Sequence, residues 1–346
     1  MALRPRDASF LQEPKMSRIL LTRRTALAAL AATALPLPAF AQSGAGVPAA
    51  FPKQPITLML PLAPGGPVDV LGRLLAQEFQ VRSGVTAVVE NRTGGAGNIG
   101  INAVKNAAAD GTTLLVIPAG NLTINPTLIP NIGFDVDKDF APITILATAP
   151  NLFLASNQLG VKTIPELIAK AKTQKITYGT PGVGSQLHLA MELFKEKAGI
   201  DITHVPYRGT APALNDLLGG HIDLLASNLP VAMPVVKDGR AQALAMTTAA
   251  RSPLLPDVPS LKELGFDGID VTSWYGLLAP KATPQPVLDA IFTVTSEVLK
   301  APALQKALAD QGLSLMIETP DVFSERIRRE AKVWGALVTE RGIKPN

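Results

Sequence analysis

The chain has 346 residues, of which 47% are hydrophobic and 17% are charged, and its formal net charge is +4. Its first 41 residues hold six basic and two acidic residues, so the rest of the chain carries 26 of each and is formally neutral. A formally neutral body removes the main support for nucleic-acid binding, which requires a basic surface on the folded domain. The sequence contains no cysteine, which excludes disulfides, thiolate nucleophiles and cysteine metal sites.

Residues 1–41 have the features of an export signal. Arg23 and Arg24 precede the apolar run TALAALAATAL, which has the length of a signal-peptide core. Two prolines end this run, which disfavours a membrane anchor, and Ala39-Phe40-Ala41 supplies a small-x-small cleavage site. We therefore predict cleavage after Ala41 and a periplasmic mature protein. The paired arginines leave both twin-arginine and Sec export open, and Met16 is an alternative start.

Strand-like and helix-like segments alternate along the rest of the chain. Three such pairs are 56–62 with 68–79, 86–91 with 99–108, and 176–180 with 186–199. The strands are continuous apolar runs, as expected for parallel strands covered by helices on both faces. Two further strands are expected at 143–150 and 151–156. Repeated strand–helix units predict an α/β fold.

Length and pattern together predict two lobes, each a mainly parallel sheet flanked by helices, with a ligand cleft between them. We expect the chain to cross between the lobes near 146–153 and to return near 271–279. The first lobe then comprises residues 43–148 and 277–346, and the second lobe comprises residues 149–276.

Glycine-rich turns follow four of the predicted strands where a helix begins. They are Ala63-Pro64-Gly65-Gly66-Pro67, Thr93-Gly94-Gly95-Ala96-Gly97-Asn98, Thr180-Pro181-Gly182-Val183-Gly184-Ser185 and Tyr207-Arg208-Gly209-Thr210. Such a turn exposes unpaired backbone N–H groups at the positive end of the helix dipole. The turns therefore predict an organic anion held by peptide amides, and the alternative is that they are ordinary strand-to-helix connections.

Two charged side chains accompany these turns. Asp69 falls in a first helical turn, where its carboxylate can satisfy nearby amides or accept a hydrogen bond from a ligand amine or a bridging water. Arg208 can pair with a second ligand carboxylate through two parallel hydrogen bonds, or it can be a solvated surface arginine.

Motifs for cofactors, metals or catalysis are incomplete. Gly95-x-Gly97-x-x-Gly100 matches the dinucleotide fingerprint, but it lies in the second strand–helix unit and lacks the acidic residue about 20 positions further on. His188 and Glu192 have the spacing of a metal pair without a third ligand nearby in sequence. No nucleophile–base motif occurs. The sequence therefore indicates neither a cofactor, nor a metal, nor an enzyme.

Many ordered motifs resemble the Bug family, also called the TctC family, which comprises the periplasmic solute receptors of tripartite tricarboxylate transporters. They are FPKQPITLMLPLAPGGPVDVLGRLLAQEF, VVENRTGGAGNIG, ADGTTLLV, KDFAPI, YGTPGVGSQLHLAMELFK, HVPYRGTAPALNDLLGGHID, LPDVPSLKELGF and SWYGLLAPKATP. The resemblance extends from Phe51 to the closing WGALVTERGIK.

The resemblance implies a two-lobed periplasmic binding protein that needs no cofactor and closes on a small carboxylate. Carried over by position, its ligand-binding residues are Pro64, Gly65, Gly66, Pro67, Val68, Asp69, Thr180, Pro181, Gly182, Val183, Gly184, Ser185, Gln186, Tyr207, Arg208, Thr210, Asn228 and Asn121. Val68 stands where many members carry a small hydroxyl residue, so we expect one side-chain hydrogen bond fewer and a shifted ligand preference.

The implied partners are the membrane permease subunits of a tripartite tricarboxylate transporter, and we expect a monomeric receptor. The ligand that the resemblance implies is a di-, tri- or aromatic carboxylic acid. Two alternative functions stay open at this stage: a carboxylate sensor that feeds a two-component kinase, and an exported hydrolase or isomerase on the same fold.

Overall fold

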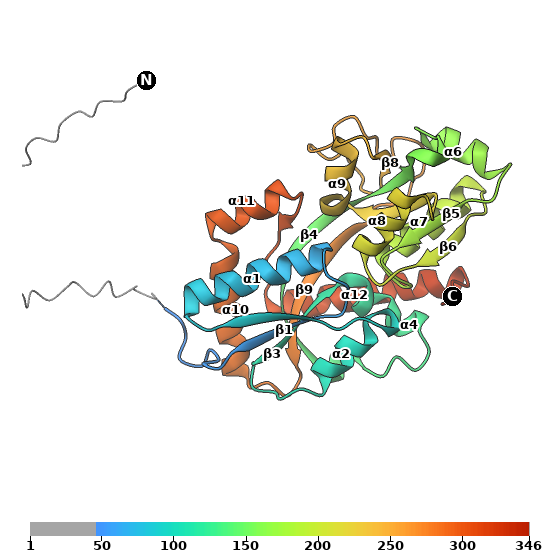
Figure 1. Cartoon of the computed structure of the whole chain (residues 1–346). Coiled ribbons are helices and arrows are strands. Elements are labelled where there is room, and N and C mark those ends of the chain that lie inside the picture. Colours follow the sequence, from blue (N-terminus) through green and yellow to red (C-terminus); the bar gives the residue numbers. More distant parts are fainter. Residues whose placement is uncertain (1–45, 346) are drawn as a thin grey trace, which may run out of the picture. The chain divides into compact units, whose positions relative to one another are not determined.

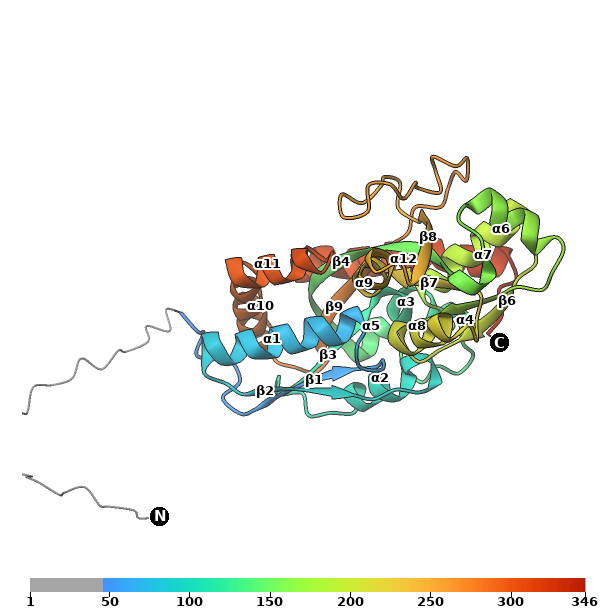
Figure 2. The ribbon, with the colours of Figure 1, turned by 45° about the horizontal axis from the view of Figure 1, so that its top comes forward.

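The computed structural model describes residues 46–345, and Figures 1 and 2 show its ribbon from two directions. The segment 1–41, for which we predict export and cleavage, lies outside these residues. Within the described part, no helix combines the length and the apolar character needed to cross a lipid bilayer.

Strands and helices alternate through most of this part. The strands are β1 (Ile56–Leu60), β2 (Ala87–Asn91), β3 (Thr113–Pro118), β4 (Phe140–Ser156), β5 (Thr177–Thr180), β6 (Thr203–Pro206), β7 (Leu224–Asn228), β8 (Ala241–Met246), β9 (Thr272–Pro280) and β10 (Ser314–Leu315). The α-helices are α1 (Pro67–Ser83), α2 (Asn98–Lys105), α3 (Ala119–Thr123), α4 (Asn125–Leu128), α5 (Val136–Asp139), α6 (Ile164–Ala171), α7 (Gln186–Ala198), α8 (Thr210–Gly219), α9 (Leu229–Lys237), α10 (Gln285–Leu299), α11 (Pro302–Asp310) and α12 (Pro320–Glu340). The one-turn 3-10 helices are η1 (Gly95–Gly97) and η2 (Asn157–Leu159).

The strands form two sheets that share β4. The first sheet has the order β2-β1-β3-β9-β4, with β10 also beside β4. The second has the order β4-β7-β5-β6, with β8 also beside β4. β1 pairs in parallel with β2 and β3, and β5 pairs in parallel with β6 and β7. These parallel pairs follow from the strand–helix–strand units of the sequence, whose crossover connections join parallel strands.

Strand β4 connects the two sheets. Its residues 140–150 pair antiparallel with β9 in the first sheet, and its residues 151–156 pair antiparallel with β7 and β8 in the second. The strands expected at 143–150 and 151–156 are therefore one continuous strand. Each sheet with its helices forms one lobe, so the predicted two-lobed α/β fold is confirmed. Both sheets are mixed and not mainly parallel as predicted, because β4 and β9 cross between the lobes and pair antiparallel with their neighbours. The lobe boundaries that we expect at residues 148 and 276 stay a prediction.

Helices cover both faces of the first sheet. On one face α1, α10 and α11 pack around a core that includes Leu58, Phe79 and Ile291. On the other face Ile101 and Leu115 are among the residues of a second core, to which α2 and α3 contribute. β1 and β3 are therefore buried from both sides, which explains why they read as unbroken apolar runs.

The second sheet is covered in the same manner. α6 and α7 pack on one face around Phe153, Tyr178 and Phe194. α8 and α9 pack on the other face, where Leu154 and Leu217 are fully buried. The two layers of helices hold β5 and β7 between them, so the loops at the ends of these strands start from a rigid support.

Helix α12 packs on both lobes. Near its start Phe323 and Ile327 belong to a core of the first lobe, and towards its end Trp334 and Leu337 pack against a core of the second. From its middle, Glu330 accepts a hydrogen bond of 2.8 Å from the indole Nε1 of Trp274 on β9. β4, β9 and α12 therefore connect the lobes.

Candidate ligand-binding site

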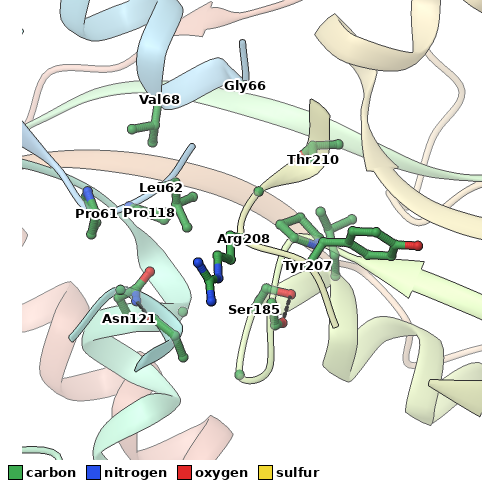
Figure 3. A pocket seen from close by; sticks show the side chains of 18 of the residues that line it. Pro61, Leu62, Gly66, Val68, Pro118, Asn121, Ser185, Tyr207, Arg208 and Thr210 are labelled. Atoms are coloured by element: carbon green, nitrogen blue, oxygen red, sulfur yellow. Dashed lines mark hydrogen bonds between the residues drawn. The ribbon is translucent and has the colours of Figure 1, made fainter. Parts of the chain in front are cut away.

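A cavity of about 220 Å³ lies between the lobes, where strands end and helices begin (Figure 3). From the first lobe and β9 it is lined by Pro61, Leu62, Ala63, Gly66, Pro67, Val68, Gly94, Gly95, Ala96, Gly97, Pro118, Gly120, Asn121, Asn125, Ser273 and Tyr275. From the second lobe it is lined by Pro181, Gly182, Val183, Gly184, Ser185, Gln186, Leu187, Pro206, Tyr207, Arg208, Gly209, Thr210 and Asn228. Ligands of open α/β sheets bind at this edge.

Three long helices begin at the wall of this cavity. α1 starts after Gly66, α7 after Ser185 and α8 after Gly209. The first amides of a helix have no partner within the helix, and they carry the positive end of its dipole. Pro67 occupies the first position of α1, where its missing N–H costs no helical hydrogen bond. Val68 therefore supplies the first amide of α1.

The turn before α1 is fixed by a carboxylate that does not line the cavity. Asp69 accepts a hydrogen bond of 3.1 Å from the backbone N–H of Gly65 and two of 3.0 Å from the guanidinium of Arg73. Burial favours the neutral acid, but these hydrogen bonds outweigh it and lower the pKa of Asp69 below its usual value. Gly65 has φ +87°, a conformation that glycine adopts without strain.

The loop before α7 is fixed by hydroxyl groups. The Ser185 hydroxyl accepts a hydrogen bond of 3.1 Å from the amide of His188, which caps the helix, and it donates one of 2.8 Å to the carbonyl of Gly182. The Thr180 hydroxyl lies 2.7 Å from Nε2 of His204. The Ser185 side chain is used in this cap, and the amides of Gly184 and Ser185 are bonded to His188 Nδ1 and to the Gly182 carbonyl. The other backbone amides of the loop remain groups that it can offer to a ligand.

The lobes contact each other on two sides of the cavity. On one side the amide of Ala63 donates a hydrogen bond of 2.9 Å to the carbonyl of Arg208. On the other side Gly120 and Gly184 approach closely, and a Cβ at Gly120 would overlap with the Gly184 carbonyl. A Cβ at Gly184 would overlap with the side chain of Asn125. The lobes are therefore closed over the cavity in this structure.

A buried polar network lies at the floor of the cavity, where β4 and β9 pass between the lobes. The side-chain oxygen of Asn228 accepts a hydrogen bond of 3.2 Å from the Thr210 hydroxyl. Its amide nitrogen donates hydrogen bonds to the side-chain oxygen of Asn151 at 2.7 Å and to the hydroxyl of Ser273 at 3.1 Å. The Ser273 hydroxyl donates in turn to Asn151 at 3.0 Å. These four side chains are buried, and the amide nitrogen of Asn151 donates a further hydrogen bond of 3.1 Å to the carbonyl of Val271.

The charge of the lining has one sign. Arg208 alone is formally charged among the described residues that line the cavity, and no aspartate or glutamate occurs among them. Figure 3 shows its guanidinium extending from the loop before α8 towards Asn121. Leu62, Val68 and Pro118 add apolar walls. Backbone donors, one cation and apolar walls make a cavity that suits an organic anion.

A family model matches this chain over residues 71–343, and its description is "Tripartite tricarboxylate transporter family receptor", TctC. The chain belongs to the TctC family. Members of this family are solute-binding receptors, so the TctC receptor described here is not an enzyme.

Relatives of this TctC receptor include Protein BugT of Bordetella pertussis, which is 34% identical over 297 residues, 85% of this chain and 91% of that protein. Among solved structures, R. palustris Rpa4515 with adipate is 33% identical with a TM-score of 0.82, covering 85% of this chain and 99% of that one. MatC of Rhodopseudomonas palustris with bound malate is 30% identical with a TM-score of 0.79, covering 83% and 100%.

The structure brings most of the predicted binding residues of this TctC receptor to one cavity. Those that line it are Gly66, Pro67, Val68, Pro181, Gly182, Val183, Gly184, Ser185, Gln186, Tyr207, Arg208, Thr210, Asn228 and Asn121. Pro64, Gly65, Asp69 and Thr180 are not among the lining residues. Gly65 and Asp69 bond to each other, and the Thr180 hydroxyl faces His204. That the lining residues bind the ligand stays a prediction.

Several lining residues were not predicted. The sequence predicts a glycine-rich turn at Gly94–Gly97 without placing it in the site, although the turn follows β2 at the same sheet edge. Pro118 ends β3 and Gly120 is the second residue of α3, so their position at a strand-to-helix junction is a usable signal. Tyr275 lies inside the apolar strand β9, where no sequence pattern separates a cavity residue from a core residue.

His188 and Glu192, whose spacing raised the question of a metal site, have other partners. Glu192 accepts hydrogen bonds from the Tyr178 hydroxyl and from Lys195. The ring of His188 stacks on that of His204, with 4.2 Å between the ring centroids. Within residues 46–345, no group of three or more histidine, aspartate or glutamate side chains is arranged to hold a metal ion.

Proposed function

We propose that this TctC receptor captures a small carboxylate between its lobes and delivers it to the permease subunits of a tripartite tricarboxylate transporter. One observation carries the proposal: α1, α7 and α8 begin at a cavity whose described lining has one arginine and no acidic residue. The ligand's carboxylate then accepts hydrogen bonds from backbone amides of the facing glycine loops. Arg208 pairs with a second carboxylate of the ligand.

The energies of these interactions are sufficient for useful affinity. A helix N-terminus stabilises an anion by about 0.3–2 kcal/mol, and a hydrogen bond to a charged group contributes about 1.5–3 kcal/mol. Micromolar affinity requires about 8 kcal/mol, so amides of two loops together with Arg208 reach it. The apolar walls add the burial of the ligand's carbon chain.

The relatives support a carboxylate as ligand. Rpa4515 with adipate and MatC with bound malate are both structures with dicarboxylates, and both match this chain over more than four fifths of its length. We expect the chain to be exported to the periplasm and cleaved after Ala41. A receptor meets such solutes in the periplasm. We expect it to work as a monomer, and a role as a carboxylate sensor for a two-component kinase is the alternative for the same site.

The first prediction concerns binding and charge. We expect the melting temperature of the mature protein to rise with at least one acid among succinate, malate, glutarate, adipate and citrate. Gly66→Asp should abolish this rise, because it places a negative charge at the start of α1. Position 66 accepts a side chain, since φ is −90° and no atom lies within 4 Å of the added Cβ.

Gly66→Asn is the matched control, because it has the shape of aspartate without the charge. We expect it to keep most of the thermal shift. Equal affinity of Gly66→Asp and the wild-type protein would show that the anion binds elsewhere. A protein that is stabilised by neutral sugars or by cations, and by no acid, would contradict the proposed function.

A further inference from the structure

Three polar side chains of the cavity wall have solvent-accessible atoms without a partner among the described residues. They are Asn121, Gln186 and Arg208. The other polar side chains of the described lining form hydrogen bonds within the protein or have their unpartnered atom closed off from solvent. Arg208 and Gln186 each offer donors to a carboxylate. Asn121 differs, because only its oxygen is free and an amide oxygen can only accept.

The orientation of the Asn121 amide is fixed by its nitrogen. Nδ2 donates a hydrogen bond of 2.7 Å to the carbonyl of Ala96. Oδ1 accepts no hydrogen bond from the described residues, and unlike Oδ1 of Asn125 it is not closed off from solvent. Asn121 lines the cavity and is 7% exposed. When a ligand displaces water from the cavity, this oxygen needs a new donor, because an acceptor buried without one is unfavourable.

The Asn121 amide and the Arg208 guanidinium extend towards each other from the two lobes (Figure 3). Asn121 belongs to α3 of the first lobe, and Arg208 lies in the loop before α8 of the second. The guanidinium has no hydrogen bond or ion pair with a described residue, so it is free for the second carboxylate of the ligand. An acceptor is therefore placed next to the group that holds this carboxylate.

We propose that this TctC receptor selects acids that carry a hydroxyl group on the carbon next to a carboxylate. Arg208 pairs with that carboxylate, and the neighbouring hydroxyl donates a hydrogen bond to Oδ1 of Asn121. The inference rests on the proposed function, because it requires an acid in the cavity, and it adds the substituent by which the receptor chooses among acids.

The charge of the cavity distinguishes a hydroxyl from an amino group at the same place. An ammonium group can also donate to Asn121, but it would lie beside the guanidinium of Arg208, in a cavity at which three helices begin with their positive ends. No described lining residue is an aspartate or a glutamate that would compensate this charge. A hydroxyl donates the same hydrogen bond without adding positive charge.

Calorimetry with acids that share a carbon chain tests this preference. The sets are succinate, malate and aspartate; glutarate, 2-hydroxyglutarate and glutamate; and adipate, 2-hydroxyadipate and 2-aminoadipate, with enantiomers measured separately. In the set that binds best, we expect one hydroxy enantiomer to bind about three- to tenfold more tightly than the unsubstituted acid, the effect of one neutral hydrogen bond. The amino acid should bind at least about tenfold more weakly than the hydroxy acid.

Asn121→Leu tests the acceptor, because leucine has a similar shape without the oxygen. The carbonyl of Ala96 still accepts a hydrogen bond of 3.3 Å from Nδ2 of Asn125. We expect Asn121→Leu to bind the hydroxy acid and the unsubstituted acid with equal affinity. Asn125→Ala is the matched control, because it removes the other donor to Ala96 but no accessible oxygen. It should keep the wild-type ratio of the two affinities, since a change in the Ala96 turn acts on both acids alike.

The outcomes separate this inference from the proposed function. If the wild-type protein binds acids but prefers no hydroxy acid, or if Asn121→Leu keeps the wild-type ratio, the role of Asn121 is wrong and the proposed function stands. Tightest binding of the amino acid also overturns it, because the site then accepts an ammonium group. If Asn121→Leu does not fold, the order of the three acids on the wild-type protein decides alone. If no acid binds, both the proposed function and this inference fail.

Discussion

Asp69 illustrates how a carboxylate is accommodated close to a site for anions. Arg73 neutralises its charge, and the carboxylate also accepts a hydrogen bond from the backbone N–H of Gly65. The residue is 6% exposed, and it does not line the cavity. An unpaired carboxylate at this place would oppose an anionic ligand, whereas the paired one fixes the turn that presents the start of α1.

We predict that Asp69→Asn lowers the free energy of unfolding by about 1–3 kcal/mol, because it removes a charge-assisted hydrogen bond and leaves Arg73 without its partner. Chemical denaturation at pH 7 measures this difference, and Asp267→Asn at an exposed position is the control. Because the pKa of Asp69 is lowered in the folded protein, its contribution is present at neutral pH and is lost as the pH falls below about 4. Unchanged stability of Asp69→Asn would contradict this role.

Among the secondary-structure elements, the loop between β5 and α7 is supported from behind by stacked rings. The ring of Tyr178 on β5 stacks on that of His204 on β6, and His204 stacks on His188 of α7, with centroid distances of 4.8 and 4.2 Å. The amide of Gly184 in the loop donates to Nδ1 of His188 at 3.4 Å. Side chains, and not solvent, therefore lie behind the loop that faces α1.

Burial disfavours charge on both imidazoles of this stack. It lowers the pKa of His188 to about 4, with Lys195 acting in the same direction and Glu192 against it. It lowers the pKa of His204 to about 3, assisted by His188 and Lys195. Both side chains are therefore neutral at pH 7. In the unfolded chain each of the two histidines takes up a proton near pH 6.5. Between pH 6.5 and the folded-state pKa values, the unfolded state therefore binds more protons than the folded state.

We predict that the protein loses stability as the pH falls from about 6.5 to about 4, by up to about 1.4 kcal/mol per pH unit for each of the two histidines. Denaturation curves at several pH values measure this slope. His188→Phe should have a flatter slope, because it removes one of the protonation sites. The same slope in His188→Phe as in the wild-type protein would refute the assignment.

For the whole molecule, the decisive feature is that the two lobes meet around the cavity. Ala63 and Arg208 bond across one side, and Gly120 and Gly184 pack against each other on the other side. Binding between hinged lobes requires that they open for entry and close for capture. β4, β9 and α12 are the connections about which such a movement has to occur. A small change at a contact between the lobes should therefore act on affinity through closure.

We predict that Gly120→Ala weakens acid binding by at least about tenfold, because its Cβ overlaps with the Gly184 carbonyl of the closed form. Position 120 lies in α3 without a positive φ, so alanine is compatible with its backbone and the lobe itself should stay folded. Small-angle scattering with saturating acid should give a larger radius of gyration for Gly120→Ala than for the wild-type protein.

Gly219→Ala is the control for closure, because its Cβ meets only the ring of His221 at ordinary contact distance, in α8. It should bind and scatter as the wild-type protein does. If Gly120→Ala bound acids with full affinity and compacted in the same way, the contact at Gly120 and Gly184 would not limit closure.

The local sequence by itself determined the strand–helix units and the glycine turns between them, since apolar periodicity and backbone conformation depend on neighbouring residues. It also placed nine of the lining residues, Gly66–Val68 and Pro181–Gln186, in the loops at 64–69 and 180–186. Only the tertiary structure decided that 143–156 is one strand through both lobes, because the pairing with β7, β8 and β9 overrides Pro150 and Asn151. It likewise decided the place of Tyr275, because burial beside a cavity depends on contacts between segments far apart in the chain.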